Sequence, residues 1–285
     1  MTSPTETPPI NTPERWRDHF PWLKAEHNKY DRGHVVILGG EWHSTGATKL
    51  AAYAALRAGA GLVSVACDAR SLPLYAASFQ AVMTKWTETS ADFIKLIGDP
   101  RIAAILIGPA AGVTDHTRIS VIEALAARKA LVLDADALSV FSETPEMLFA
   151  STHASCIFTP HEGEFARLFG KHVNKQDDRA SRVLQAARLS GAVIILKGAE
   201  TLIAAPDGRI IVNTNAPALL ATAGSGDVLA GICTGLLAQG MPPFESACAG
   251  VWLHSEAARH FGAGLIAEDI ADQLPRILQK MYDER

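Results

Sequence analysis

The sequence of 285 residues lacks closely spaced cysteines. It has four, Cys67, Cys156, Cys233 and Cys248, and no two of them form a CxxC pair. All four lie in segments that are otherwise apolar. This pattern favours reduced thiols in the core of a cytoplasmic protein over metal ligands or disulfides.

Long hydrophobic runs and an excess of positive charge are also absent. No uncharged apolar run reaches the roughly 20 residues of a membrane-spanning helix, because Asp227 interrupts the longest candidate. Residues 1–15 are rich in proline and threonine and have neither a basic start nor an apolar stretch, so we expect a flexible tail and no secretory signal. The net charge of −4 gives no general attraction to nucleic acid or to anionic membranes.

Short β-branched or aliphatic runs alternate with amphipathic segments over residues 16–285. The runs are almost continuously hydrophobic, which is typical of strands covered on both faces. Alternation of strand and helix predicts one α/β domain, a three-layer sandwich with helices on both faces of a mostly parallel sheet. The turn at 206–208 predicts a hairpin. The predicted strands are 34–38, 62–66, 103–107, 130–133, 155–158, 193–196, 202–205 and 209–212, and the predicted C-terminal helices are 227–238, 243–261 and 267–282.

Polar loops follow the predicted strands at their carboxyl ends. Ligands bind at that edge in open α/β sheets, so we expect these loops to build one site. They are residues 39–46, 108–112, 134–136, 159–164, 197–201 and 224–227.

The loop 224–227, Gly-Ser-Gly-Asp, carries the most specific chemistry. Its glycines allow close approach to a ligand, and the helix that follows directs unpaired N–H groups at an anion. Asp227 would repel a phosphate unless it takes a proton or holds a metal. This combination suggests phosphoryl transfer, although an N-capped helix after a glycine turn is an equally good interpretation of the motif by itself.

The other loops are ambiguous one by one. The loop 39–46 matches neither GxGxxG nor the Walker motif, and 108–112 is compatible with a plain tight turn. Glu164 can cap a helix or hold Mg²⁺ through water, and His161 can cap that helix or donate to a substrate. Asp134 and Asp136 suit a hydrated Mg²⁺, or one of them caps a helix near Ala137. The segment 197–201 can line a nucleotide or form a solvated turn.

Together these segments resemble the ribokinase-like superfamily, and within it the ADP- or ATP-dependent NAD(P)H-hydrate dehydratases. The resemblance runs from about Lys29 to the C-terminus, and its most specific parts are PHEGEFARL at 160–168 and ATAGSGDVLAG at 221–231. It implies a carbon–oxygen lyase that repairs (6S)-NADHX and (6S)-NADPHX. ADP would phosphorylate the ring hydroxyl, and loss of phosphate would give NADH or NADPH, with AMP and phosphate as the other products.

The resemblance also implies roles for individual residues. Asp227 would meet the hydroxyl of the hydrate, where we expect it to act as the catalytic base. Mg²⁺, which we expect from the carboxylates themselves, would be bound through water by Glu164 and Asp134. The hydrate would contact Ala47, Gly112, His161 and Asp227. The nucleotide would contact Lys197, Gly198, Ala199, Glu200, Thr201, Gly224, Ser225 and Gly226.

Two segments depart from the family pattern. Ala110 replaces the central glycine of Gly-Pro-Gly-x-Gly, and Asn215 is displaced from the position of the usual Asn-Pro-Gly, so we leave Asn215 out of the site. The resemblance further implies a homo-oligomer and an epimerase that is a separate protein.

Two other functions are compatible with the residues. A vitamin-precursor or sugar kinase of the same superfamily would use Asp227 equally well, although His161 in place of the asparagine common in those kinases argues against it. A non-catalytic nucleotide-binding module is disfavoured by the intact carboxylate beside the anion site.

Overall fold

The computed structural model describes residues 7–285, and within them the chain forms a nine-stranded sheet. The strand order is β3-β2-β1-β4-β5-β6-β7-β8-β9. Neighbours from β3 to β7 are parallel, and β8 and β9 add an antiparallel hairpin at one edge. The strands are β1 His34–Leu38, β2 Leu62–Cys67, β3 Met83–Trp86, β4 Ile102–Ile107, β5 Ala130–Leu133, β6 Cys156–Phe158, β7 Val193–Leu196, β8 Thr201–Ala204 and β9 Ile210–Asn213.

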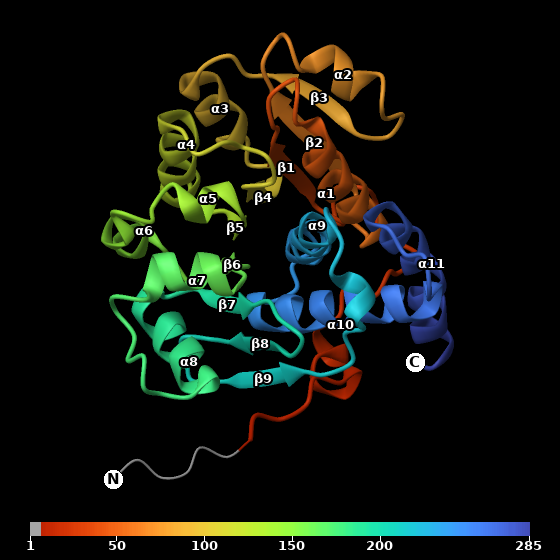
Figure 1. Ribbon diagram of the computed structural model, residues 1–285. Helices are drawn as coiled ribbons and strands as arrows, with labels where there is room; N and C mark the ends of the chain where they lie inside the picture. Colours follow the sequence, from red (N-terminus) through yellow and green to blue (C-terminus); the bar gives the residue numbers. More distant parts are fainter. Residues whose placement is uncertain (1–6) are drawn as a thin grey trace.

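Helices cover both faces of the sheet, which confirms the predicted three-layer sandwich. Figure 1 shows α3 to α8 on one side, and α1 with α9, α10 and α11 on the other. The helices are α1 Thr45–Arg57, α2 Leu72–Ala76, α3 Ser90–Ile97, α4 Asp115–Ala126, α5 Asp136–Ser139, α6 Pro145–Ser151, α7 Glu162–Phe169, α8 Arg179–Ser190, α9 Ser225–Ala238, α10 Pro243–Phe261 and α11 Ala267–Asp283, with short 3₁₀ turns at Pro13–Arg15, Arg17–His19 and Ala218–Leu220.

Alternate residues of each central strand serve different cores. In β1, Val35 and Ile37 pack with α1 and α9, whereas Val36 and Leu38 pack with the helices of the opposite layer. Side chains of a strand point to opposite faces in turn. A strand buried on both faces therefore needs apolar residues at every position, which explains the continuous hydrophobic runs.

Small residues bring α1 and α9 unusually close together. A β-carbon on Gly231 would lie 2.2 Å from the carbonyl oxygen of Ala51, and one on Gly235 would lie 2.6 Å from that of Ala55. Only glycine allows such backbone approach. The close packing sets the first turns of α1 and α9 beside each other at the carboxyl edge of the strands, where the polar loops lie.

The prediction that the chain is a flexible tail up to residue 15 is wrong for its second half. Ile10 bridges to Val212 of β9, and the buried Asn11 donates to Asn213 Oδ1 at 3.0 Å and to the Cys248 carbonyl at 2.8 Å. The indole of Trp16 donates to Asn11 Oδ1. An asparagine in a proline-rich segment gave no sign of these long-range bonds. Residues 1–6 of the predicted tail lie outside the described residues.

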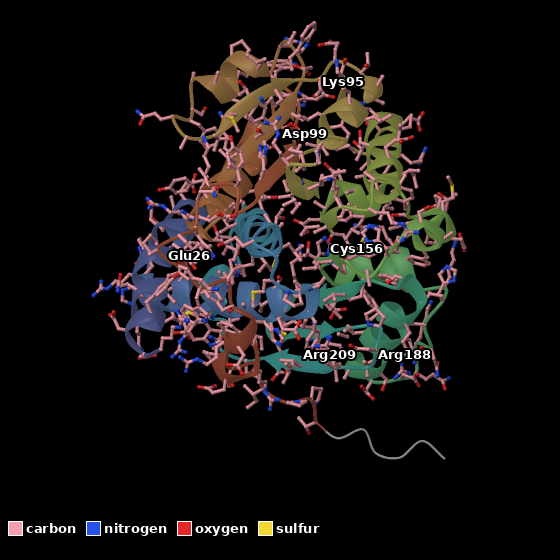
Figure 2. All side chains as sticks on the ribbon, turned by 180° about the vertical axis from the view of Figure 1, so that it is seen from behind. Glu26, Lys95, Asp99, Cys156, Arg188 and Arg209 are labelled. Carbon is pink, nitrogen blue, oxygen red and sulfur yellow. The ribbon has the colours of Figure 1, made fainter. Side chains whose placement is uncertain are left out.

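The eight predicted strands are present, each end within one residue of its predicted position. The edge strand β3 was missed because its residues, MTKW, are half-exposed or exposed and include no apolar run. The four cysteines are buried, and Cys156 lies within the sheet in Figure 2. Burial raises the pKa of Cys156 to about 12, so its thiol stays protonated. Among the described helices, none is both long and apolar enough for a bilayer.

Candidate active site

The turn before α9 builds an anion site from backbone groups. Gly224 has φ +88°, and a β-carbon there would lie 2.5 Å from Leu50 Cδ1, so only glycine fits. The helix begins at Ser225, and no residue within 7–285 accepts a hydrogen bond from the N–H of Gly226 or of Asp227. Free N–H groups at a helix start attract anions. The turn therefore has the unpaired N–H groups that the glycine-rich motif predicts, and phosphate binding there stays a prediction.

Asp227 stands on the first turn of α9 with an unusual protonation equilibrium. Its pKa is raised to about 7, first because burial disfavours the charged carboxylate, then because Asp134 and Asp136 add negative charge. Lys197 opposes the shift. A carboxylate whose pKa is close to physiological pH is suited to general-base catalysis, since it can accept a proton and release it again.

Lys197 is the cation at the centre of three carboxylates. Its Nζ lies 2.8 Å from Asp134 Oδ1, and a β-carbon on Gly226 would lie 3.3 Å from the same Nζ. Burial lowers the pKa of Lys197, but Asp134, Glu164 and Asp227 raise it by more, so its pKa lies above the ordinary value. The ammonium therefore stays charged beside the start of α9.

The two carboxylates of the segment Asp134-Ala135-Asp136 accept hydrogen bonds from different partners. Ala135 has φ +45°, a strained conformation of the kind that recurs at functional sites. Asp134 Oδ1 accepts from Thr159 Oγ1 and from Lys197, while Asp136 Oδ2 accepts from the N–H of Gly112 at 2.9 Å. Neither carboxylate caps a helix. Because Asp136 accepts from Gly112, it holds the loop 108–112 in place.

Loops 39–46 and 108–112 are tied together through Thr48. Its hydroxyl accepts from the N–H of Gly40 at 3.0 Å and donates to the carbonyl of Pro109 at 3.2 Å. Gly108 has φ +137°, and a β-carbon there would lie 1.8 Å from the Asp134 carbonyl oxygen. Ala110 has φ +57°, a left-handed conformation that explains why glycine is the usual residue of the pattern.

His161 and Glu164 form a capping box at the start of α7. Nδ1 of His161 accepts from the N–H groups of Gly163 and Glu164, and Glu164 Oε2 accepts from the N–H of His161 at 2.8 Å. Glu164 Oε1 lies 3.3 Å from His161 Nε2. Both residues therefore have the capping role that the sequence allowed, while the exposed ring of His161 also faces a cleft.

That cleft has a volume of about 710 Å³ and lies between the loop 197–201, the turn before α9 and α10. It brings together seven of the predicted site residues: His161, Lys197, Gly198, Ala199, Thr201, Ser225 and Gly226. The remaining predicted residues do not line it. They are Ala47, Gly112, Asp134, Glu164, Glu200, Gly224 and Asp227. Ala47 is in the first turn of α1, and the N–H of Gly112 donates to Asp136; Glu200 is exposed, and Gly224 faces Leu50.

Sequence reasoning missed one wall of the cleft and two residues that shape it. Residues Ala216, Pro217, Ala218 and Leu220 form an apolar wall, and His254 on α10 also lines the cleft. Arg179 donates to the carbonyl oxygens of Leu196 and Glu200, so it braces the loop 197–201. The apolar stretch before the GSGD turn could have been a signal for the wall; neither His254 nor Arg179 belongs to a motif.

The acidic residues suit Mg²⁺ only in company with phosphate. Among residues 7–285, no three His, Cys, Asp or Glu side chains are grouped as ligands of a metal ion. Both carboxylate oxygens of Glu164 face His161, and Asp134 Oδ1 is shared by Lys197 and Thr159. Mg²⁺ often binds through one or two carboxylates, water and substrate phosphates. Asp134 Oδ2, and a water molecule held by Glu164, would suit an ion bound in this way.

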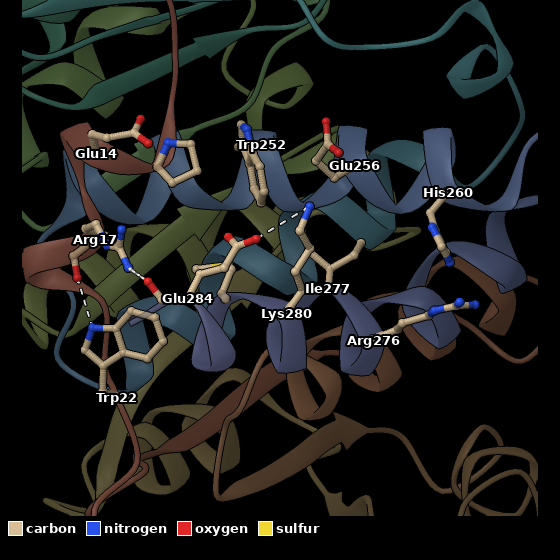
Figure 3. A pocket seen from close by; sticks show the side chains of 12 residues that line it. Glu14, Arg17, Trp22, Trp252, Glu256, His260, Arg276, Ile277, Lys280 and Glu284 are labelled. Atoms are coloured by element: carbon tan, nitrogen blue, oxygen red, sulfur yellow. Dashed lines mark hydrogen bonds and ion pairs between the residues drawn. The ribbon is translucent and has the colours of Figure 1, made fainter.

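A second cavity, of about 450 Å³, is lined by a different set of residues. Figure 3 shows it between the N-terminal segment, α10 and α11, with Trp22, Trp252, Glu256 and Lys280 on its walls. Lys280 and Glu284 face each other across 3.8 Å. None of the predicted site residues lines it.

Structural comparison places the fold in the ribokinase-like class. A ribokinase-like superfamily protein from Enterococcus faecalis has a TM-score of 0.83 at 26% identity and covers 98% of each chain. The ADP/ATP-dependent NAD(P)H-hydrate dehydratase from Bacillus subtilis, co-crystallised with ATP/Mg²⁺, has a TM-score of 0.81 at 29% identity, covering 97% of this chain and 99% of its own.

Sequence comparison then gives the family. The NAD(P)H-hydrate dehydratase family model matches residues 35–280. An ADP-dependent (S)-NAD(P)H-hydrate dehydratase from Neisseria meningitidis is 38% identical, covering 92% of this chain and 90% of its own. The chain belongs to the NAD(P)H-hydrate dehydratase family. A bifunctional NAD(P)H-hydrate repair enzyme from Moorella thermoacetica is 37% identical over 94% of this chain, which spans only 53% of that relative.

Proposed function

We propose that this protein is an ADP-dependent NAD(P)H-hydrate dehydratase acting on (6S)-NADHX and (6S)-NADPHX. The observation that carries the proposal is the position of Asp227. Its carboxylate, with a pKa near 7, stands on the same helical turn as the free N–H groups of Gly226 and Asp227. The family membership and the relatives' activities support the choice of substrate.

The two halves of the site suit two ligands. The cleft beside Lys197, Gly198 and Gly226 would take ADP, with its phosphates toward the start of α9. The hydrate would lie on the other side of Asp227, against Ala47 and Gly112, with His161 at the border. Asp227 is then between the hydroxyl of the hydrate and the phosphoryl group that it receives.

The chemistry follows from what each group can do. The hydroxyl oxygen attacks the β-phosphorus of ADP, its proton goes to Asp227, and the bond from phosphorus to AMP breaks. The charge on the transferred group is stabilised by N–H groups of the turn and by Lys197. The carbon–oxygen bond then breaks with its electron pair leaving on phosphate, and the neighbouring ring carbon loses a proton, which gives NADH or NADPH.

Mg²⁺ would be held by the phosphates of the nucleotide, with Asp134 and Glu164 bound through water. When bound, the ion neutralises phosphate charge. We further expect a cytoplasmic homo-oligomer whose partner in the pathway is an NAD(P)HX epimerase. The bifunctional relatives, named as NAD(P)H-hydrate repair enzymes, support the link to a broader repair reaction.

The test is incubation of the purified chain with either hydrate and either ADP or ATP. We expect the absorbance of the reduced nicotinamide to return, with one AMP and one phosphate released for each molecule recovered from ADP. A sugar or vitamin kinase would consume nucleotide with its own substrate and recover no NADH. A binding module would bind ADP and recover none either.

A further inference from the structure

His254 is a buried residue of α10 that contacts the turn before α9. Its side chain and backbone together are 6% exposed. Nε2 lies 2.9 Å from the carbonyl oxygen of Ser225 and 3.1 Å from Ser225 Oγ. Both residues line the cleft. One ring nitrogen of His254 therefore contacts the backbone and the side chain of the first residue of α9.

These two contacts determine where the protons are. A carbonyl oxygen can only accept a hydrogen bond, so Nε2 of His254 must carry the hydrogen. Ser225 Oγ, facing that same N–H, is then an acceptor toward His254. A hydroxyl that accepts from one side has its own proton free to donate elsewhere. For Ser225 the remaining direction is the cleft that it lines.

The surroundings keep the imidazole neutral. Burial lowers the pKa of His254 to about 4, the bond to the Ser225 carbonyl opposes this shift, and the charge of Lys197 adds to it. A neutral ring with its proton on Nε2 leaves Lys197 as the cation of this wall. His254 therefore adds no charge to the wall, and its effect comes from the fixed direction of its Nε2–H dipole.

We propose that His254 is a positioning residue which makes the Ser225 hydroxyl a fixed hydrogen-bond donor to the phosphate of the nucleotide in the cleft. The inference rests on the proposed function, because it takes the anion to be a nucleotide phosphate. Ser225 Oγ–H then joins the N–H groups of Gly226 and Asp227 as a third donor of one turn. Donors fixed before the reaction stabilise developing charge without reorganisation.

A double-mutant cycle tests the coupling. Ser225→Ala removes the donor, and we expect a loss of about 10²-fold in turnover with ADP, as for other preorganised donors. His254→Leu should cause a similar loss in the wild-type background and little further loss in Ser225→Ala. His254→Gln, which retains an N–H donor, should recover part of the activity.

Ser246→Ala is the matched control. Ser246 is a buried hydroxyl on the same helix and donates to the Met241 carbonyl at 3.0 Å, away from the cleft. We expect this variant to lose stability and retain wild-type kinetics. Independent effects of Ser225→Ala and His254→Leu that multiply in the double variant would overturn the proposal, because they would show that His254 acts through packing alone.

Two readouts separate this inference from the proposed function. Nitrogen-15 NMR of the histidine rings should show His254 with its proton on Nε2, and a proton on Nδ1 would overturn the inference whatever the activity. Calorimetry with ADP alone should give the same coupling between Ser225 and His254 as the kinetics. Failure of the wild type to recover NADH, with this coupling intact in ADP binding, would reject the dehydratase and keep the positioning role.

Discussion

Nζ of Lys197 lies 2.8 Å from Oδ1 of Asp134, a carboxylate that is 1% exposed. The pair joins the ends of β5 and β7 beneath the turn before α9, so the cation that faces the cleft is held by a buried anion. Stability and the proposed nucleotide binding would therefore be linked at one contact.

Lys197→Met should separate these two roles. Removing one partner of a buried ion pair leaves the other charge uncompensated, so we expect a loss of about 3 kcal/mol in the free energy of unfolding, measured by urea denaturation. Adding Asp134→Asn should restore most of that stability without restoring ADP binding. A double variant that binds ADP normally would show that Lys197 serves the fold only.

Because the pKa of Asp227 is raised, Asp227→Asn should stabilise the fold by an amount that depends on pH. The folded-state pKa of about 7 lies above the ordinary 3.8. Between those values the folded state binds more protons than the unfolded state, so stability falls as pH rises through about 7. The Asp227→Asn variant has no charge at this position, so its Tm should exceed that of the wild type by more at pH 8 than at pH 5. Each kcal/mol of added stability corresponds to about 2–4 °C in Tm. An equal change at both pH values would contradict the raised pKa.

Ala110→Gly should relieve backbone strain. The left-handed conformation at φ +57° costs an L-residue about 1–2 kcal/mol, and glycine adopts it freely. We expect a Tm at or above that of the wild type, with turnover unchanged or higher. Ala111→Gly is the control, because Ala111 has no positive φ and glycine there should only destabilise. Equal destabilisation by both variants would mean that Ala110 is not strained.

Arg179→Met should weaken ADP binding through the loop 197–201. Arg179 donates to the carbonyl oxygens of Leu196 and Glu200, and its charge pairs with Glu162. Without it the loop has fewer fixed contacts, so KM for ADP should rise about 10-fold while KM for the hydrate changes little, which corresponds to roughly 1.4 kcal/mol. Arg188→Ala, an exposed arginine of the same helix (Figure 2), should leave both constants unchanged. Equal rises in both KM values would argue against a specific brace.

Asn11→Ala should destabilise the whole domain. Asn11 is 4% exposed, and its side chain bonds to Asn213, to Cys248 and to Trp16. Removal of the amide therefore leaves several buried groups without a hydrogen-bond partner. The cost should be about 1–3 kcal/mol in thermal or urea unfolding. Asn174→Ala, at an exposed asparagine, should cost much less. A negligible effect of Asn11→Ala would restore the prediction of an unattached tail up to residue 15.

The sheet could be predicted because its signal is local. Each strand from β4 to β7 is buried on both faces, so a run of three to six apolar residues is enough to identify it. Strand β3 has no such signal, because one edge of the sheet leaves Met83 to Trp86 partly exposed. Asn11 was misjudged for the complementary reason: the two groups to which it donates, in Asn213 and Cys248, are more than 200 residues away in the chain.

The site divides in the same way. Asp227 and its glycines form one turn, so their chemistry is evident in eight consecutive residues. His254 contacts Ser225 across 29 residues, and Arg179 reaches Leu196 across 17. Such contacts depend on how helices pack, and neither residue type is diagnostic alone. The positive φ of Ala135, which separates Asp134 from Asp136, likewise follows from the folded chain.

The most direct test of the account compares the wild type with Asp227→Asn in ADP-dependent recovery of NADH from NADHX. We predict that the variant binds ADP with near wild-type affinity and recovers NADH about 10²–10⁴-fold more slowly, as expected for a lost general base. The acid limb of the wild-type kcat/KM profile should have a pKa near 7 in the free enzyme. Near-normal recovery by Asp227→Asn would contradict the central role of this carboxylate.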